Sequence, residues 1–140
     1  MKALIDTNVL LDNLLRREPF YEDAKKVVSY CLFREEGFIA AHSFADMFFL
    51  MHERNNRSVE YCRNTFLKLC RMFEVCDINK EKIIAAAENA AFDDFEDALQ
   101  AECADSAEVD CIVTRNPKDF AGSSVVVYSP KEFVLLMENQ

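Results

Sequence analysis

The sequence alternates between short apolar runs of strand length and longer segments with helical periodicity. Only two glycines and three prolines occur in the 140 residues, so the connections must be short. The expected strands lie at residues 3–6, 37–41, 74–77, 111–114 and 125–128, and the expected helices at 7–15, 21–33, 43–51, 58–72, 80–91, 94–107 and from 130 onward. This alternation predicts an α/β fold with a mostly parallel sheet of about five strands, covered by helices on both faces.

The length and composition indicate one globular domain spanning residues 1–140. Hydrophobic residues make up 51% of the chain and charged residues 29%, which excludes a disordered or fibrous protein. No apolar run approaches the ~18 residues that a membrane helix needs. The apolar run after Met1 is interrupted by Asp6, so it does not look like a secretory signal. We therefore expect a cytoplasmic protein without a membrane partner.

Charge is distributed unevenly along the chain. The net charge is −9, with +1 in residues 1–72 and −10 in residues 73–140. A protein that grips duplex DNA with its whole surface is usually basic. The charge therefore argues against that partner, and it leaves room for a local basic patch beside an acidic pocket.

Cysteine and histidine give little sign of a metal or disulfide framework. None of the six cysteines forms a Cys-x-x-Cys pair, and most lie in apolar stretches, which favours reduced thiols in the core. The two histidines, His42 and His52, have no Cys or His at zinc-ligand spacing. We interpret both histidines as structural.

Acidic and polar side chains follow the expected strands or begin the helices after them. These clusters are Asp6-Thr7-Asn8, Ser43 to Asp46, Asp94 to Asp97 and Thr114 to Asp119. In a parallel sheet such residues meet at the carboxyl edge, where ligands bind. Several carboxylates in one pocket repel one another unless a cation neutralises them. Oxygen ligands alone select a hard cation, Mg²⁺ or Mn²⁺.

Helix capping is the competing interpretation of three of these clusters. Ser43-x-x-Asp46, Asp94-x-x-Asp97 and Asn116-x-x-Asp119 all fit a capping box or its acidic variant. Asp6 is different because it ends a buried strand, where an unpaired carboxylate costs several kcal/mol. A metal or phosphate role is therefore the favoured interpretation of Asp6.

Three motifs carry a resemblance that covers essentially the whole chain. LIDTNVLL at 4–11, DFEDALQ at 94–100 and IVTRNPKDF at 112–120 resemble the PIN-domain nuclease family, in the family's order. The resemblance implies a three-layer α/β/α sandwich. It also implies a Mg²⁺- or Mn²⁺-dependent ribonuclease that cleaves single-stranded RNA with a metal-activated water. Many small bacterial members are toxins of VapC-type toxin–antitoxin pairs, which implies an antitoxin as a partner.

The resemblance also assigns the acids of the site. Asp6 matches the family's first metal-binding acid, Asp97 its third, and Asp46 lies in the segment of the second, which is commonly the longer Glu. The position of the last acid holds Asn116, and Asp119 is expected to stand in for it. The expected metal ligands are Asp6, Asp97 and Asp119, with Asp46 as a further catalytic acid. One carboxylate fewer predicts one firm metal site rather than two.

The neighbouring polar residues receive supporting roles. Thr7, Asn8 and Thr114 resemble the residues that orient the acids and the attacking water, and a turn or cap is their alternative role. Asn116 is expected to add a neutral oxygen, and Arg115 to contact RNA. Glu96 points about 100° away from Asp97 around a helix, which favours a solvated or supporting position.

Two functions from different classes remain open at this stage. The first is a metal-dependent endoribonuclease. The second is a catalytically weak PIN-like module that binds RNA or protein, which Asn116 motivates. Receiver and haloacid-dehalogenase folds are minor alternatives, because Asp6-Thr7-Asn8 lacks the second acid that each requires. The apolar, aromatic helices of the first half also predict a homodimer.

Overall fold

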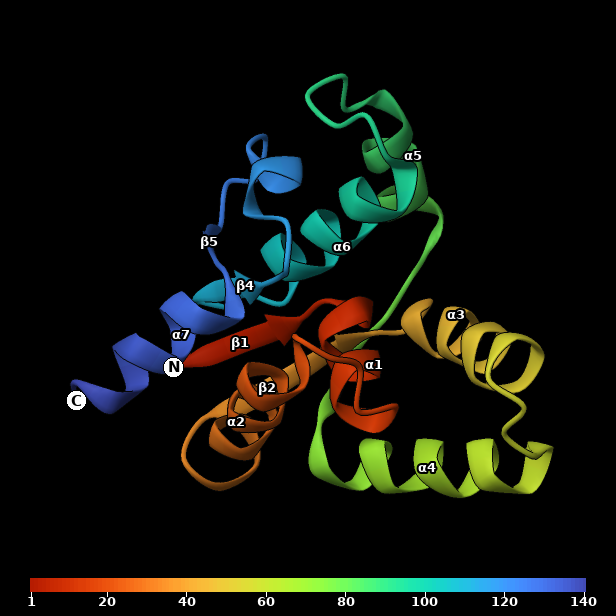
Figure 1. Cartoon of the computed structure of the whole chain (residues 1–140). Helices are drawn as coiled ribbons and strands as arrows, with labels where there is room; N and C mark the ends of the chain where they lie inside the picture. Colours follow the sequence, from red (N-terminus) through yellow and green to blue (C-terminus); the bar gives the residue numbers. More distant parts are fainter.

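The computed structural model describes residues 1–140 and contains one parallel sheet of five strands. The strands are β1 (Lys2–Ile5), β2 (Glu36–Ala40), β3 (Glu74–Cys76), β4 (Cys111–Val113) and β5 (Val126–Tyr128). Their order across the sheet is β3-β2-β1-β4-β5, and every neighbouring pair is parallel. The predicted fold class is confirmed, and each strand lies within one residue of its expected position (Figure 1).

Helical segments connect the strands. They are α1 (Thr7–Leu14), α2 (Tyr21–Phe33), α3 (Ser43–Phe48), the π-helix η1 (Phe49–Arg54), α4 (Val59–Met72), α5 (Lys80–Glu88), α6 (Phe95–Ser106), the 3₁₀-helix η2 (Pro117–Phe120) and α7 (Pro130–Glu138). None of them combines the length and the apolar character needed to cross a membrane. Two expected helices differ in extent: the one at 43–51 becomes α3 continued by η1, and the one at 80–91 ends at Glu88.

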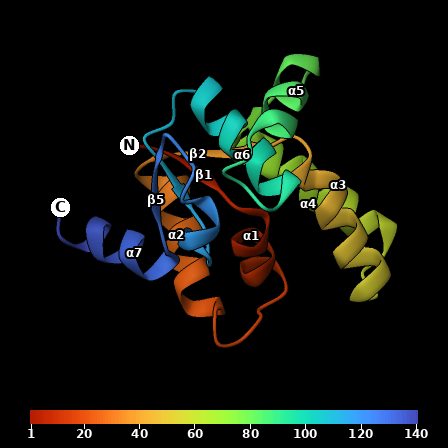
Figure 2. The same ribbon diagram turned by 90° about the horizontal axis from the view of Figure 1, so that it is seen from above.

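The sheet separates two layers of helices (Figures 1 and 2). On one face, α1, α2, α4 and α7 pack around side chains such as Ile5, Ile39 and Val113. On the other face, α5 and α6 cover Leu4 and Ile112. The alternating residues of β1 therefore serve both cores, as expected for a strand covered on both sides. All six cysteines are free, and five of them are buried, as the sequence predicts.

Side-chain caps explain where most of the later helices begin. Ser58, Asn79 and Asp94 each accept a hydrogen bond from the backbone N–H three residues on. Ser129 and Glu132 form a full capping box at the start of α7. Ser43 was expected to cap as well, but it lies inside α3 after His42. Its hydroxyl instead accepts a hydrogen bond from Thr7, so the buried polar group is satisfied across elements.

The order in which the strands are added to the sheet reverses at its centre. From β1 the chain proceeds to β2 and β3 on one side, and it then crosses to β4 and β5 on the other. Beyond the carboxyl ends of β1 and β4, the connections leave in opposite directions, which opens a crevice. The backbone N–H of Asp6 donates to the carbonyl of Val113 at 3.0 Å. Asp6 and the Thr114 turn are thereby held side by side at this point.

Candidate active site

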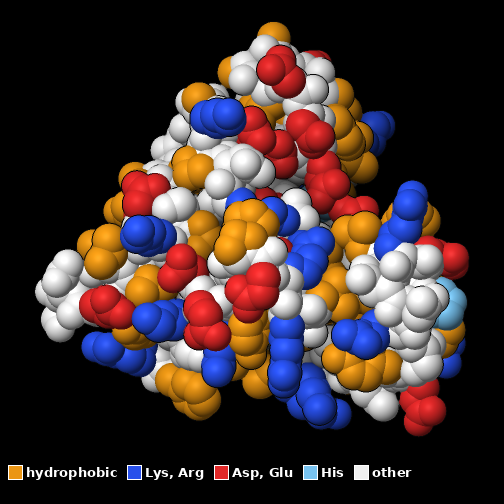
Figure 3. Space-filling view, viewed as in Figure 1, with side chains coloured by type: hydrophobic (Ala, Val, Ile, Leu, Met, Phe, Trp, Pro, Cys, Tyr) orange, Lys and Arg blue, Asp and Glu red, His pale blue; other side chains and the backbone are white.

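A strongly polar cavity of about 220 Å³ lies at this switch point. Its lining comes from the ends of β1 and β4, from the start of α6 and from η2. The lining residues are Asp6, Asn8, Asp94, Glu96, Asp97, Thr114, Asn116, Asp119 and Phe120. Figure 3 shows acidic side chains gathered on the upper lobe, which α5 and α6 form, and at its base. The structure thus brings Asp6, Asp97 and Asp119 together, as expected for a cation site.

Asp6 is the most firmly held acid of the cavity. Its side chain is 6% exposed. One carboxylate oxygen accepts from Gln100 Nε2 at 2.6 Å, and the other accepts from Thr114 Oγ1 at 2.8 Å. Thr114 Oγ1 also accepts from the backbone N–H of Asn116 at 3.2 Å, which fixes the turn after β4. Two donors orient the carboxylate while its remaining lone pairs stay free for a ligand.

Gln100 was not predicted as a site residue, although it lies in the DFEDALQ motif. It is fully buried in α6 and is the only polar residue among Ala98, Leu99 and Ala101. A polar side chain three residues after Asp97 lies on the same helix face, and this spacing is the signal that could have identified it. Gln100 acts on the site through Asp6 rather than by facing the cavity.

The carboxyl group of Asp97 has a strongly raised pKa. Burial raises its pKa to about 7, and the negative charges of Asp94, Asp6 and Asp119 add to the shift. Asp94 accepts a hydrogen bond from the Asp97 backbone N–H at 3.0 Å, so it caps α6. Asp94 also lines the cavity. Capping and site membership are therefore compatible for this cluster. Carboxyl groups gathered this closely repel one another when ionised, so either a proton or a cation stabilises the cluster.

Glu96 lies closer to the site than the sequence suggested. It lines the cavity and is only partly exposed. Burial raises its pKa to about 8, and contact with the Asp46 carboxyl group and the charges of Asp46, Asp6 and Asp94 contribute. Asp46 itself lies beside Glu96 rather than among the residues that line the cavity. Asp46, which is shorter than a glutamate, therefore contacts Glu96 and does not line the cavity itself.

Arg115 forms an ion pair with the buried carboxylate of Asp12, and Asn8 is linked to the same carboxylate through Arg17. Arg17 donates to the Asn8 carbonyl at 3.1 Å and to Asn8 Oδ1 at 3.2 Å, so the Asn8 amide nitrogen is the group left for the cavity. Arg17 Nε and Arg115 Nε lie 2.8 and 2.9 Å from the two oxygens of Asp12. Arg115 also stacks over Phe20 and does not line the cavity. The sequence did not identify Asp12, which is 0% exposed.

Thr7 serves the site indirectly. It is buried, and its hydroxyl donates to Ser43 Oγ at 2.7 Å. This bond joins the start of α1 to the start of α3, next to His42. Thr7 therefore positions the elements that carry the acids and does not face the cavity.

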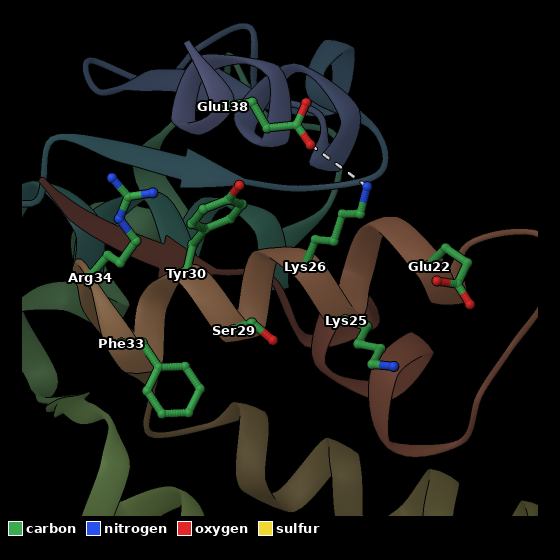
Figure 4. Close-up of a pocket in the computed structure, with 8 residues that line it drawn as sticks. All are labelled: Glu22, Lys25, Lys26, Ser29, Tyr30, Phe33, Arg34 and Glu138. Carbon is green, nitrogen blue, oxygen red and sulfur yellow. Dashed lines mark ion pairs between the residues drawn. The ribbon is translucent and has the colours of Figure 1, made fainter. Parts of the chain in front are cut away.

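A larger cavity, of about 400 Å³, lies along α2 and is shown in Figure 4. It mixes charges: Lys25, Lys26 and Arg34 line it together with Glu22 and Glu138. The figure shows Lys26 directed toward Glu138 of α7, with which it pairs at 3.7 Å. Its cations and anions partly balance, so it lacks the concentrated charge that would define a cofactor site.

The acidic cavity fits a hard divalent cation. Its potential ligands are carboxylate, amide and hydroxyl oxygens, and it offers no thiolate or imidazole. Such a donor set suits Mg²⁺ or Mn²⁺, which usually keep part of their water shell. The 220 Å³ volume leaves room for that water and for a phosphate group.

The raised pKa values make the stability of the metal-free protein depend on pH. Asp97 and Glu96 have folded-state pKa values of about 7 and 8, above those of the unfolded chain. Between pH ~4 and ~8 the folded state binds more protons, so the free energy of unfolding falls as the pH rises.

We expect Asp97→Asn to raise the Tm of the metal-free protein, with a gain roughly 3 °C larger at pH 8 than at pH 5. The gain is modest because these half-buried groups are partly screened by solvent. Thermal denaturation in EDTA measures it, and saturating Mg²⁺ at pH 8 should stabilise the wild type more than the variant. Equal gains at both pH values would contradict the assignment.

The parallel sheet and the acids at its switch point define the class of protein. The PIN domain family model matches residues 2–118. The chain belongs to the PIN domain family. Members of this family are typically nucleases and generally use divalent metals. None of the curated protein sequences matches the chain significantly.

Solved structures share the fold. A toxin–antitoxin complex from Klebsiella pneumoniae matches with a TM-score of 0.69 at 22% identity, over 91% of this chain and 97% of that one. VapBC-1 from nontypeable Haemophilus influenzae matches with a TM-score of 0.67 at 16% sequence identity, over 94% of this chain and 99% of that one. PAE2754 from Pyrobaculum aerophilum matches with a TM-score of 0.64 at 18% sequence identity, over 100% of this chain and 91% of that one. At these identities the likeness establishes the fold and not the activity.

Proposed function

We propose that the protein is a Mg²⁺- or Mn²⁺-dependent endoribonuclease that cleaves single-stranded RNA. The observation that carries this proposal is the cavity in which Asp97 and Asp119 face the buried carboxylate of Asp6. The PIN fold supports it, because the acids occupy the ligand-binding edge of the sheet. The excess of negative charge in this region would bind RNA poorly without a cation.

The residues have separable roles in this proposal. Asp6, Asp97 and Asp119 would hold the cation, and Asn116 would add a neutral amide oxygen. When bound, the cation neutralises phosphate oxygens and makes water a better nucleophile. Gln100 and Thr114 keep Asp6 in one orientation, so little reorganisation accompanies catalysis. The amide nitrogen of Asn8 is placed to donate to a phosphate oxygen or a water in the cavity.

The acids beside the cation ligands provide proton acceptors. Glu96 and Asp97 hold raised pKa values of about 8 and 7, in the range where a group exchanges protons near neutral pH. Asp97 is assigned to the cation, which requires its ionised form. Glu96 is therefore the remaining group, and in its ionised form, which dominates above about pH 8, it would accept a proton as water attacks the phosphate.

A toxin role with a protein antitoxin is the finer part of the proposal. Its support comes from the structural neighbours, which include a toxin–antitoxin complex and VapBC-1. Exposed apolar side chains on α2 and α4, such as Phe33 and Leu67, offer surface that a protein partner would cover. A homodimer could use the same surface and stays a prediction.

The alternative is a catalytically weak module that binds RNA or protein. Asn116 favours it, because a neutral side chain lines the cavity where a fourth carboxylate would strengthen cation binding. Asp119 lines the same cavity but is exposed on η2, so it is held less firmly than Asp6.

Cleavage of labelled single-stranded RNA tests the two functions. We expect purified protein to cut the RNA with Mn²⁺ or Mg²⁺ and to stop when EDTA is added. An Asp6→Asn, Asp97→Asn double variant, purified identically, controls for contaminating nuclease. If the wild type and this variant cut alike, or neither cuts while RNA still binds, the binding module replaces the nuclease.

A further inference from the structure

A small pocket lies beside the turn that follows β4. Its volume is about 120 Å³, and its lining residues are Pro19, Phe20, Asp23, Arg115 and Pro130. They come from the loop before α2, the first turn of α2, the turn after β4 and the start of α7. A closed cavity of about 150 Å³ accommodates benzene. This pocket, which opens to solvent, therefore has room for the edge of one planar base.

Phe20 and Arg115 form a stacked pair in this pocket. The guanidinium carbon lies 4.0 Å from the centroid of the Phe20 ring, whereas the other cation–ring contacts of the chain measure 5.4 to 5.9 Å. Phe20 is nevertheless 40% exposed, so it keeps surface that a planar ligand can cover. Aromatic rings and guanidinium planes are the groups on which unpaired RNA bases stack.

Asp12 fixes the orientation of Arg115. Arg115 Nε lies 2.9 Å from Asp12 Oδ2, and Asp12 is fully buried. Because this ion pair orients the guanidinium before a ligand arrives, less side-chain entropy is lost on binding. The two prolines of the lining add rigid walls, since their rings fix the backbone angle φ. The pocket is therefore preformed.

Asp23 supplies a polar edge to the pocket. Its carboxylate is partly exposed and forms no ion pair. An ionised carboxylate only accepts hydrogen bonds, so it selects a base that presents N–H groups. Guanine presents a ring N–H and an amino group side by side, which match the two carboxylate oxygens. Uracil instead flanks its single N–H with two carbonyl groups that repel a carboxylate.

The pocket adjoins the acidic cavity through one turn. Arg115 lies between Thr114 and Asn116, which both line that cavity. A strand with a phosphate in the cavity therefore has a neighbouring base within reach of Phe20. Two arginines share the single charge of Asp12, so this turn keeps a net positive charge that attracts an RNA backbone.

We propose that Phe20, Arg115 and Asp23 bind one base of single-stranded RNA, with a preference for guanine, next to the phosphate in the acidic cavity. The inference rests on the proposed function for its substrate and adds base selection to it. The base stacks on the pair of Phe20 and Arg115, and its donor edge faces Asp23. The cavity then holds a phosphate whatever the sequence, and the pocket supplies the sequence preference.

Fluorescence of 2-aminopurine tests the stacking. We expect a short oligouridine with one central 2-aminopurine to lose fluorescence on binding, because stacking quenches this base. Binding is measured at low salt in the Asp6→Asn, Asp97→Asn background, which leaves the RNA uncut and removes negative charge from the cavity. In this background, Phe20→Leu is expected to weaken binding by about 10-fold, and Phe20→Tyr to retain it.

Tyr21→Leu is the matched control for the loss of a ring. Tyr21 is the next residue, its ring also contacts the cations of Arg16 and Lys25, and it lies outside the pocket. This variant should bind the probe like the parent protein. The inference is overturned if the bound probe stays unquenched, if Phe20→Leu binds like the parent, or if Tyr21→Leu loses as much affinity as Phe20→Leu.

Competition between guanosine and inosine tests Asp23. Inosine differs from guanosine only in lacking the amino group. We expect an oligouridine with one guanosine to displace the probe about 10-fold better than one with inosine, and Asp23→Ala to bring this ratio close to one. The ratio cancels the general effect of removing a negative charge near RNA. Equal displacement by both competitors in the parent protein would overturn the role of Asp23.

The outcomes separate this inference from the proposed function. Quenching that depends on Phe20, in a protein whose wild type does not cleave RNA with Mn²⁺ or Mg²⁺, would reject the nuclease and support the base pocket. Metal-dependent cleavage at equal rates beside every base, unaffected by Phe20→Leu, would reject the base pocket alone.

Discussion

Replacing Asp6 by asparagine is expected to lower the rate of metal-dependent RNA cleavage by about 10³-fold. The substitution removes the charge of the most deeply buried acid in the cavity. It also replaces one oxygen by a nitrogen that cannot bind a cation. Asp97 and Asp119 remain, but they are more exposed and carry their own mutual repulsion.

The fold should tolerate this substitution. The asparagine oxygen can accept from Gln100 Nε2, and its amide nitrogen can donate to Thr114 Oγ1 after the hydroxyl turns. We therefore expect a Tm within about 3 °C of the wild type. Asp6→Ala would instead leave the buried Gln100 amide without a partner, at a cost of about 1–3 kcal/mol.

The measurement combines single-turnover cleavage with calorimetric titration of Mn²⁺. Asp77→Asn is the matched control, because Asp77 also follows a strand at the carboxyl edge, is exposed and lies outside the cavity. It should cleave RNA and bind Mn²⁺ like the wild type. A folded Asp6→Asn protein with more than a tenth of the wild-type rate would show that Asp6 does not hold the catalytic cation.

The sequence predicts the elements of the fold well because their signals are local. Tyr21–Phe33 and Val59–Met72 are found with their expected bounds, since a proline break and a serine cap mark where they begin. The helix expected at 43–51 was less accurate. It continues as the π-helix η1, whose Met51 is buried in the core together with Met47 of α3, and no cap or breaker in the sequence marks the change.

The site is less predictable because its supporting contacts are long-range. Strand ends and acid positions suffice to bring Asp6, Asp97 and Asp119 to one cavity. The hydrogen bond from Gln100 to Asp6 spans 94 residues, and no local pattern encodes it. Glu96 was placed by helix geometry at the edge of the site, but its contact with Asp46 depends on how α3 and α6 pack.

The environment of Asp12 could not be predicted from the sequence either, and replacing this residue is the second substitution expected to have a large effect. From the sequence it is one acid in an apolar helix. In the fold it is fully buried and binds two arginines from different segments, Arg17 after α1 and Arg115 after β4. Burial raises the pKa of Asp12, and Arg115 and Arg17 oppose that shift. The carboxylate is thus a charged junction between two turns that border the cavity.

Asp12→Asn is expected to lower the free energy of unfolding by about 2–3 kcal/mol and the Tm by roughly 5–10 °C. Removing the anion leaves two guanidinium groups facing each other without compensation. The arginine side chains are 31% and 24% exposed, so water limits the loss below that of a fully buried pair. Thermal and urea denaturation measure it, and Glu53→Gln, an exposed acid without an ion pair, is the charge control.

Cleavage should fall as well, because Arg17 anchors Asn8 and Arg115 lies in the turn between Thr114 and Asn116. We expect a loss of about 10-fold at a temperature where Asp12→Asn is still folded. A double-mutant cycle with Arg115→Gln distinguishes a specific pair from general destabilisation, with a coupling energy of about 1 kcal/mol or more. Additive effects, or a Tm within 2 °C of the wild type, would show that the two arginines hold their positions without Asp12. The acidic cavity would then be organised by Gln100 and Thr114 alone.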